Sequence, residues 1–538
     1  MFPNSPNAYI KSVVDYSRQE TRNFAFRPVA DFLEKGAAGL AEDFPDARKD
    51  CCLWFHVFYL QTPTIHNAIL SRKDFWAIDA DSTADQSGGR LLFLRGYPSP
   101  KWLALVGHLY RVHPEYWRRH LGFLFRGGGG IPSSHVMPSA SDRVFRLRVG
   151  TIGTYGRRWR KNHSLEVLQR DAAKNMEDYL RRLADADAWK QGDSVVRQYT
   201  LHDEEHFTIE QNLTVYLHLE QHSCKWTVIV FLDSGDDLAT SPAGPWINRT
   251  NAHNNPMMVP KPPLSDIKGS TQSRWFETTP HVDSGRHFEQ VMWQSMSAIH
   301  VNYGESLDPQ LRMKDPFYLL SAIFQEDATN EEQILDLIAE KIKRLITSVE
   351  TEGSDKIDYS ILHARLLHYQ TVLDNRVEIL REKLDLLSRR GGDSWRPMAE
   401  PGAGEAIRRL ETEFEYLVES ALKLSAKLER STALTLSLAN IDEARRGTQL
   451  NSTVFRFTLV ASFYIPLSFT SSFFGMNFKE LGTGNLRLWV YFAVGIPVLL
   501  ISVLCLFVRR SWLDKISLST PRTMMRRRRW RTSELFGP

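Results

Sequence analysis

The sequence predicts an α+β membrane protein. An N-terminal mixed α/β domain precedes a long helical hairpin, whose second helix continues into the first of two C-terminal transmembrane helices. Two observations predict this: short apolar runs fill the first 240 residues, and later apolar residues recur at helical spacing up to two uncharged stretches. Of the 538 residues, 42% are hydrophobic and 24% are charged, as in a globular protein, so any lipid-facing part is local.

Residues 1–240 have the pattern of a mixed α/β domain. Short apolar runs bounded by turn residues predict five strands, at 51–60, 90–97, 143–153, 207–219 and 224–235. Helical spacing predicts a helix at 165–186, and the Pro- and Asn-rich stretch 241–285 is expected to be a loop or linker. The first residues lack the apolar core of a signal peptide, and the four cysteines have neither disulfide nor metal-ligand spacing. We therefore expect this domain in the cytosol.

Three motifs in this domain resemble enzyme signatures, and we interpret none of them as a catalytic site. In HDEEH, from His202 to His206, the glutamates do not stand where a zinc peptidase needs one, so we expect a solvated turn. RGGGGIP, at 126–132, lacks the Lys and Ser or Thr of a phosphate-binding loop. DSGDD, at 233–237, has carboxylates that suit a divalent cation, but we favour an ordinary acidic turn. With no nucleophile beside a base, we do not expect an enzyme.

Residues 286–456 are predicted to be helical. Leucine-class residues recur every three or four positions from Leu362 to Leu387, and again from Leu410 to Leu428 after a Gly- and Pro-rich loop. This pattern predicts an antiparallel hairpin. No proline interrupts the chain from Glu405 until Pro466, so the second helix is expected to run unbroken toward the membrane. About 70 residues at roughly 1.5 Å each give a stalk on the order of 100 Å long.

Two uncharged stretches, 457–474 and 488–508, are long enough to cross a bilayer, which needs about 20 residues. We expect both to be transmembrane helices joined by an outer loop at 475–487. Arginines flank the pair on its outer sides, whereas the loop holds only Lys479 and Arg487. By the positive-inside rule both termini are cytosolic, and we favour the plasma membrane over an organelle. The basic tail at 509–538 either rests on anionic lipid or is a solvated charge run.

One face of the first span combines polar ends with an apolar middle. Steps of three and four residues place seven side chains on this face, which are Asn451, Val454, Phe457, Ala461, Ile465, Ser468 and Ser472. Several copies around an axis would form a tube with a hydrophobic constriction and a polar mouth, which is typical of a channel. The small residues alternatively serve as helix contacts, and the spacing does not separate the two interpretations.

The tripeptide Gly475-Met476-Asn477 directly follows this span, and an aromatic residue, Phe474, precedes it. With the Ile-Pro-Leu-Ser-Phe run at 465–469 and the long stalk, the C-terminal region resembles the CorA family of divalent-cation channels, in particular its fungal members. The resemblance implies a homopentamer that transports Mg²⁺ as a hydrated ion, with both termini in the cytosol and the membrane lipids and its own copies as partners. We expect neither an organic cofactor nor a nucleic-acid partner.

The resemblance also implies roles for individual residues. Asn477 would present a ring of amide oxygens to the hydrated ion, Ser468 and Ser472 would form the polar pore wall, and Asn451 the inner mouth. Phe457, with Val454 and Ile465, would form the hydrophobic gate. Mg²⁺ bound between subunits closes members of the family, and the candidates for this regulatory site are carboxylates of the stalk and of the N-terminal domain: Glu411, Glu413, Glu415, Glu419, Asp442, Asp233, Asp236 and Asp237.

The outer loop departs from the family pattern. Lys479 follows the tripeptide, and Glu480 is the single acidic residue of the loop, so capture of cations is expected to be weaker. Two alternatives therefore stay open. One is a zinc transporter or a proton-coupled transporter on the same fold, and the other is a membrane-anchored interaction protein that does not conduct.

Overall fold

The structure is a computed structural model of the chain. It describes residues 5–19, 25–35, 53–58, 65–69, 89–125, 142–155, 165–185, 189–220, 225–235, 237–247, 257–258, 294–301, 303–351, 358–395, 399–474, 487, 489–502 and 504. For 53–58, 65–69, 257–258, 348–351 and 474 we describe the backbone alone. The chain divides into two units, Met1–Ala433 and Leu434–Pro538, and each is described by itself.

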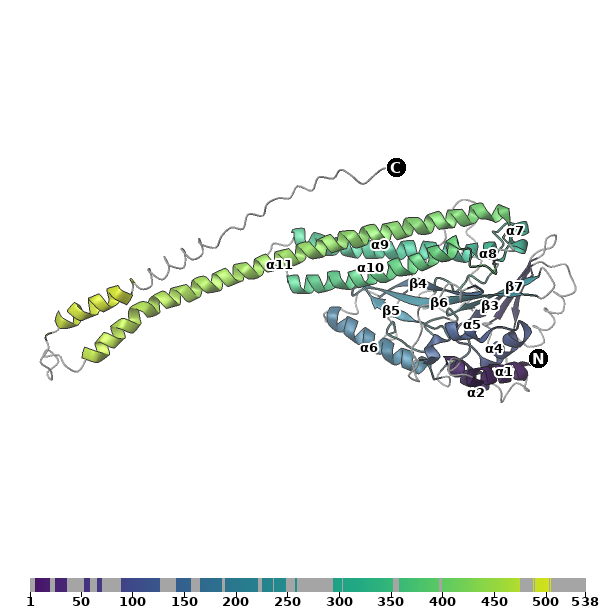
Figure 1. The fold of residues 1–538 in the computed structure, drawn as a ribbon, viewed down its shortest axis with the longest axis horizontal. Helices are drawn as coiled ribbons and strands as arrows, with labels where there is room; N and C mark the ends of the chain where they lie inside the picture. Colours follow the sequence, from purple (N-terminus) through teal and green to yellow (C-terminus); the bar gives the residue numbers. More distant parts are fainter. Residues whose placement is uncertain are drawn as a thin grey trace, which may run out of the picture. The chain divides into compact units, whose positions relative to one another are not determined.

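An eight-stranded sheet forms the centre of the first unit (Figure 1). Its strands are β1 (Leu53–Phe58), β2 (Ile65–Ile69), β3 (Gly89–Arg95), β4 (Val144–Thr154), β5 (Gln198–Leu201), β6 (His206–Leu219), β7 (Trp226–Leu232) and β8 (Met257–Met258). The strand order is β2-β1-β3-β7-β6-β4-β8, and β5 pairs with β6. Only β3 and β7 pair in parallel within this described sheet; the other pairs are antiparallel. Mixed sheets of this kind are common in α+β folds.

Helices cover both faces of the sheet, because alternate side chains of its central strands are apolar on both sides. In β3, Leu92 and Leu94 belong to one core, whereas Leu91 and Phe93 belong to the other. All seven residues of β7 are buried. The unit is therefore a three-layer arrangement with a separate hydrophobic core on each side of the sheet.

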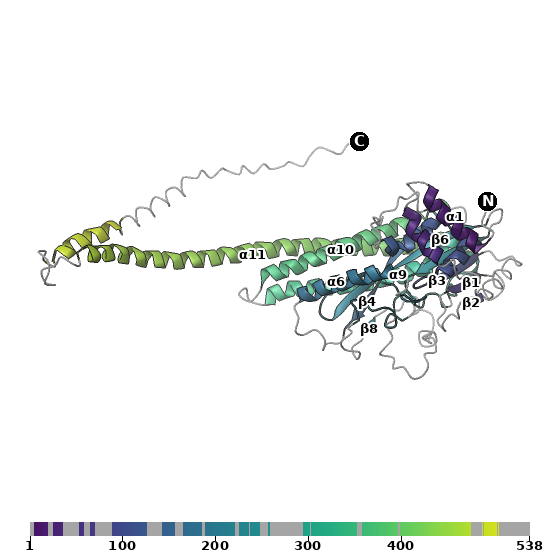
Figure 2. The same cartoon turned by 90° about the horizontal axis from the view of Figure 1, so that it is seen from below.

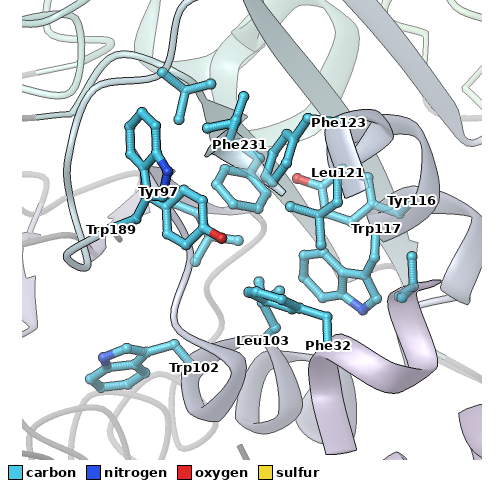
Figure 3. Close-up of a cluster of buried hydrophobic side chains, with 14 of the residues drawn as sticks. Phe32, Tyr97, Trp102, Leu103, Tyr116, Trp117, Leu121, Phe123, Trp189 and Phe231 are labelled. Atoms are coloured by element: carbon cyan, nitrogen blue, oxygen red, sulfur yellow. The ribbon is translucent and has the colours of Figure 1, made fainter. Parts of the chain in front are cut away.

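The first core lies under the helices of the N-terminal region, α1, α2, α4, α5 and α6 (Figure 1 and Figure 2). Their bounds are Pro6–Gln19, Arg27–Lys35, Pro100–Leu109, Pro114–His120 and Leu165–Leu183, and a short 3₁₀ helix, η3, spans Gly122–Phe125. Aromatic residues dominate this core (Figure 3). Tyr97 stacks on Trp189 with ring centroids 5.3 Å apart, and Trp117 donates a hydrogen bond of 2.8 Å to the hydroxyl of Tyr9. This hydrogen bond connects α5 to α1 inside the core, where the buried indole N–H needs an acceptor.

The second core lies between the sheet and the helices that follow it in sequence. These are α7 (Pro309–Lys314), α8 (Pro316–Leu319), α9 (Ser321–Thr351), α10 (Tyr359–Ser388), η10 (Pro401–Ala403) and α11 (Gly404–Phe474). Asp315 has no exposed surface and caps α8 by accepting the N–H groups of Phe317 and Tyr318, and it also accepts the N–H of Glu400 at 3.1 Å. One carboxylate therefore fixes both the start of α8 and the loop before α11.

The expected α+β organisation is confirmed in its main features. The five strands predicted from apolar runs correspond to β1, β3, β4, β6 and β7, and the predicted helix at 165–186 is α6. The predicted long helix is present as α11, which runs for 71 residues and contains Pro466. The sheet strands β2, β5 and β8 were not predicted, because they have only five, four and two residues.

Candidate ion pathway

The C-terminal part of α11 is the candidate for a membrane-spanning helix. Among the described residues, one helix is long and apolar enough to cross a bilayer, at Pro401–Phe473, and only 6% of its most apolar window is buried. Phe457, Ile465 and Tyr464 are 72%, 68% and 70% exposed. The segment 457–474 of this helix is uncharged, and so much exposed apolar surface is suited to lipid or to other helices, because water contact with such a surface is unfavourable.

A second apolar helix, Trp489–Ser502, packs against the end of α11. The hydroxyls of Ser471 and Tyr491 are 2.9 Å apart, and a Cβ placed on Gly495 would lie 3.9 Å from Oγ1 of Thr470. Thr470 is 3% exposed, so its side chain lies in this contact. The described helix is shorter than the predicted second span at 488–508, and most of residues 503–508 lie outside the described part of the chain.

The seven residues predicted to line a pore occupy one side of α11. At about 100° per residue, the set from Asn451 to Ser472 lies within an arc of about 120°. Thr470 lies on nearly the opposite side by the same count, about 160° around the helix from Ser468. The face that contacts Trp489–Ser502 is therefore not the predicted pore face. Val454, Phe457 and Ile465 are 59%, 72% and 68% exposed, which leaves this side available to other copies.

The predicted selectivity residues Gly475, Met476 and Asn477 lie outside the described residues, as do Lys479 and Glu480. What the structure gives is their attachment point, because α11 ends at Phe474, directly before the tripeptide. Their role as an ion-selective ring stays a prediction.

The predicted regulatory carboxylates of the stalk lie on α11. Glu415 is exposed, Glu419 pairs with Lys423 at 2.8 Å, and Asp442 pairs with Arg446 at 3.0 Å. No three His, Cys, Asp or Glu side chains within the described ranges lie close enough together to hold a metal ion. A metal site built from these residues would therefore need carboxylates from more than one copy.

The predicted acidic turn DSGDD was wrong at its first residue. Asp233 is 1% exposed, and both of its oxygens accept hydrogen bonds from Arg197, while Oδ1 lies 3.3 Å from Nε2 of His120. Its oxygens are engaged inside the protein, so Asp233 is not available as a ligand for a cation. Asp236 lies outside the described residues. Asp237 accepts the N–H of Ala239 at 2.9 Å and so caps a turn.

The predicted solvated turn HDEEH was also wrong at its first residue. It connects β5 to β6, and His202 is 1% exposed, so burial lowers its pKa to about 3 and keeps it neutral. Lys341 of α9 is buried against the turn, where it pairs with Asp203 and lies 3.0 Å from Nδ1 of His206. Tyr369 of α10 donates to the carbonyl of His202 at 2.9 Å. The motif thus fastens the sheet to α9 and α10. The other motif, at 126–132, lies outside the described residues.

One part of the chain matches a model of a known protein family. Residues 291–510 match the family model of the CorA-like Mg2+ transporter protein. The matched range begins just before the helices of the second core and includes α11 and the helix Trp489–Ser502. No curated protein matches the chain.

Proposed function

We propose that this chain, whose residues 291–510 form a CorA-like Mg2+ transporter domain, carries divalent metal cations across a membrane, with Mg²⁺ as the main ion. The observation that carries the proposal is the position of the predicted pore face of α11, from Asn451 to Ser472, which has polar ends and an apolar middle. This face lies away from the contact with Trp489–Ser502 and ends directly before the Gly-Met-Asn tripeptide.

A single helix cannot enclose a pore, so the proposal requires several copies around one axis. We take the number to be five, as the family resemblance implies. Exposed side chains such as Phe457 and Ile465 would then face the axis, and the helix Trp489–Ser502 would lie toward the lipid. The second helix completes a two-pass arrangement with both termini in the cytosol, since the arginines lie on the outer sides of the pair. The plasma membrane is the proposed location.

Asn477 would select the ion without stripping its water. Mg²⁺ gives up its hydration shell reluctantly, so a ring of neutral amide oxygens can accept hydrogen bonds from the bound waters. An aspartate ring would hold the ion more strongly and slow its exit. Past this ring, the hydroxyls of Ser472 and Ser468 would line the pore, and Ile465, Phe457 and Val454 would form a narrow apolar gate. Asn451 would lie at the inner mouth.

Regulation by the transported ion is part of the proposal. Glu415, Glu419 and Asp442 are exposed or paired with cations on the surface of α11, so carboxylates from neighbouring copies can approach them. Mg²⁺ bound between copies would join them, because several oxygen ligands suit a hard divalent cation. Loss of this bridge would release the closed state.

The experiment is ion flux into liposomes that contain the full chain, with Mg²⁺, Zn²⁺, Co²⁺ and Ni²⁺ tested in turn. Asn477→Leu removes the amide oxygen and is expected to abolish Mg²⁺ flux while the oligomer stays intact on size-exclusion chromatography. Asn485→Leu makes the same chemical change eight residues further along the same outer loop and is the matched control. It is expected to conduct like the parent.

Each other outcome points to a named alternative. Unchanged Mg²⁺ flux in Asn477→Leu contradicts the role of the amide ring. Flux of Zn²⁺ without Mg²⁺, or flux that needs a proton gradient, indicates the zinc or proton-coupled transporter. A parent chain that assembles but passes no ion indicates a membrane-anchored interaction protein, and such a chain would also fail to rescue magnesium-starved cells.

A further inference from the structure

Five charged side chains are buried together where β6, α9 and α10 meet in the first unit. Arg376 of α10 pairs with Glu210 of β6 and lies 3.4 Å from Oε1 of Glu331 on α9. Lys383, two turns further along α10, lies 2.9 Å from the same Glu331 oxygen and 2.7 Å from Oδ2 of Asp327. All five are between 0% and 5% exposed by side chain, so water does not screen these charges. We call these five residues the ionic cluster.

The ionic cluster holds three carboxylates and two cations. Charges face it from one further strand: Arg148 of β4 lies near Glu331 and lowers its pKa, but the guanidinium of Arg148 is itself paired with Glu382 at 3.0 Å. With all three carboxylates ionised, the cluster therefore carries one negative charge more than its own cations balance. A buried charge without compensation is costly, and one bound proton would remove it.

Asp327 is one of two carboxylates in the ionic cluster that contact a single cation of the cluster. Glu331 contacts both cations, whereas Glu210 contacts Arg376 and Asp327 contacts Lys383. Asp327 and Glu331 also lie one helical turn apart on α9, so their negative charges repel each other. Burial, with the Glu331 charge adding to it, raises the pKa of Asp327 to about 6 against the pull of Lys383. Burial alone would raise the pKa of Glu331 as well, but Lys383 and Arg376 lower it.

We propose that the ionic cluster is a proton-binding latch, which holds α9 and α10 on the sheet more firmly when the pH falls from neutral toward 5. The proton binds the carboxyl of Asp327. Lys383 then forms an ion pair with Glu331 alone, and Asp327 no longer repels the charge of Glu331. The cluster is neutral in this form, with two cations facing two carboxylates. This inference concerns the first unit and does not depend on transport.

The direction of the pH effect follows from linkage. The folded-state pKa of Asp327 lies above its ordinary value of 3.8, so the folded state binds the proton more tightly than the unfolded state does. The contribution of Asp327 to the free energy of unfolding is therefore fully present below its unfolded pKa and is lost as the pH rises through about 6. Burial lowers the pKa of His202 to about 3 and that of His218 to about 4. These two stay neutral throughout the window.

The experiment measures amide hydrogen exchange of β6, α9 and α10 in the full chain in detergent, corrected for the intrinsic effect of pH. Between about pH 7.5 and about pH 5 the equilibrium for opening in the parent is expected to fall by about tenfold. Asp327→Asn replaces the ionisable group by a neutral one of the same shape. It is expected to exchange slowly at both pH values. Asp336→Asn, an exposed position on the same helix, is the matched control and should behave like the parent.

Two results would overturn the proposal. One is a pH dependence in Asp327→Asn equal to that of the parent. The other applies even if this variant fails to fold, because it uses the parent chain labelled with ¹³C at the aspartate carboxyl. Infrared spectra should show a protonated aspartic acid band that grows with a midpoint near pH 6. If no such band grows between about pH 7.5 and about pH 5, the cluster binds no proton there.

Discussion

Arg197 holds Asp233 with two hydrogen bonds, 2.7 Å from Nε to Oδ2 and 2.6 Å from Nη2 to Oδ1. Asp233 stands directly after β7, and Arg197 directly before β5, so this pair joins the ends of two strands that pair along the same edge of β6. Asp233 also accepts the backbone N–H of Asn212 in β6 at 2.5 Å. One buried carboxylate thus connects three parts of the chain around the end of β7.

Asp233→Ala should therefore destabilise the first unit strongly. It leaves the Arg197 guanidinium without its carboxylate, and removing one partner of a buried ion pair costs about 3–5 kcal/mol. Chemical unfolding followed by tryptophan fluorescence measures the loss. Asp171→Ala on the exposed side of α6 is the control, with an expected change within about 0.5 kcal/mol. Equal losses in the two variants would mean that the pair contributes nothing.

The same carboxylate should give the fold an acid limit. Burial alone would raise the pKa of Asp233, but Arg197 and His120 together outweigh this effect and lower the pKa to about 2 from 3.8. A carboxyl with a depressed folded-state pKa stabilises the fold above its unfolded pKa, and this contribution of about 2 kcal/mol is lost as the pH falls toward 2. Below about pH 4, the free energy of unfolding should fall more steeply with decreasing pH in the parent than in Asp233→Asn. Chemical unfolding at a series of pH values measures this dependence.

A three-glycine junction should be intolerant of side chains. A Cβ on Gly235 would overlap the carbonyl oxygen of Gly192, and Gly96 beside it has a positive φ of 67°. Backbone atoms cannot move aside as the end of a side chain can, so Gly235→Ala is expected to cost about 1–3 kcal/mol or more. Gly122→Ala is the control, because no atom lies within 4 Å of its added Cβ. Thermal unfolding compares the two, and a lower loss in Gly235→Ala than in the control would contradict the close packing.

The apolar pattern of the sequence predicted the strands and the long helix because burial selects their side chains directly. It failed where charged groups are buried. Leu384 fits the leucine-class spacing from Leu362 to Leu387, yet it is only partly buried, whereas the side chain of Lys383 beside it is 2% exposed. Tyr369, Leu373, Arg376, Leu380, Lys383 and Leu387 follow steps of four and three. The helical spacing of the buried face was thus present in the sequence. It was missed because Arg376 and Lys383 are charged, and charged residues are usually on the surface.

The buried ends of β5 and β7 were missed for a related reason. HDEEH and DSGDD look like exposed turns because most of their residues are charged. Their partners, Lys341 and Arg197, come from sites 135 and 36 residues away, as the bonds of His206 and Asp233 show. Charge pairing over such separations has no periodicity in the sequence. Only the tertiary structure identifies the partner that compensates the desolvation cost of a buried charge.

Two apolar residues on different sides of α11, Phe457 and Leu459, allow a test of the proposed pore face. Phe457 is the largest side chain on the proposed pore face and is 72% exposed. Leu459 is two residues further on, so it lies about 160° away around the helix, and it is 43% exposed. Both lie in the same uncharged stretch. Truncation of either removes similar apolar surface at the same depth, but only Phe457 would narrow a pore.

Phe457→Ala is expected to raise Mg²⁺ flux into liposomes several-fold, because a bulky apolar ring at a constriction opposes the passage of a hydrated ion. Leu459→Ala should conduct like the parent. The comparison is made at equal amounts of assembled oligomer, measured by size-exclusion chromatography, so that a change in assembly is not counted as a change in conduction. An equal rise in both variants would mean that loosened packing, and not a wider constriction, admits the ion. No change in Phe457→Ala would place the constriction elsewhere on α11, and the assignment of Phe457 to the gate would be wrong.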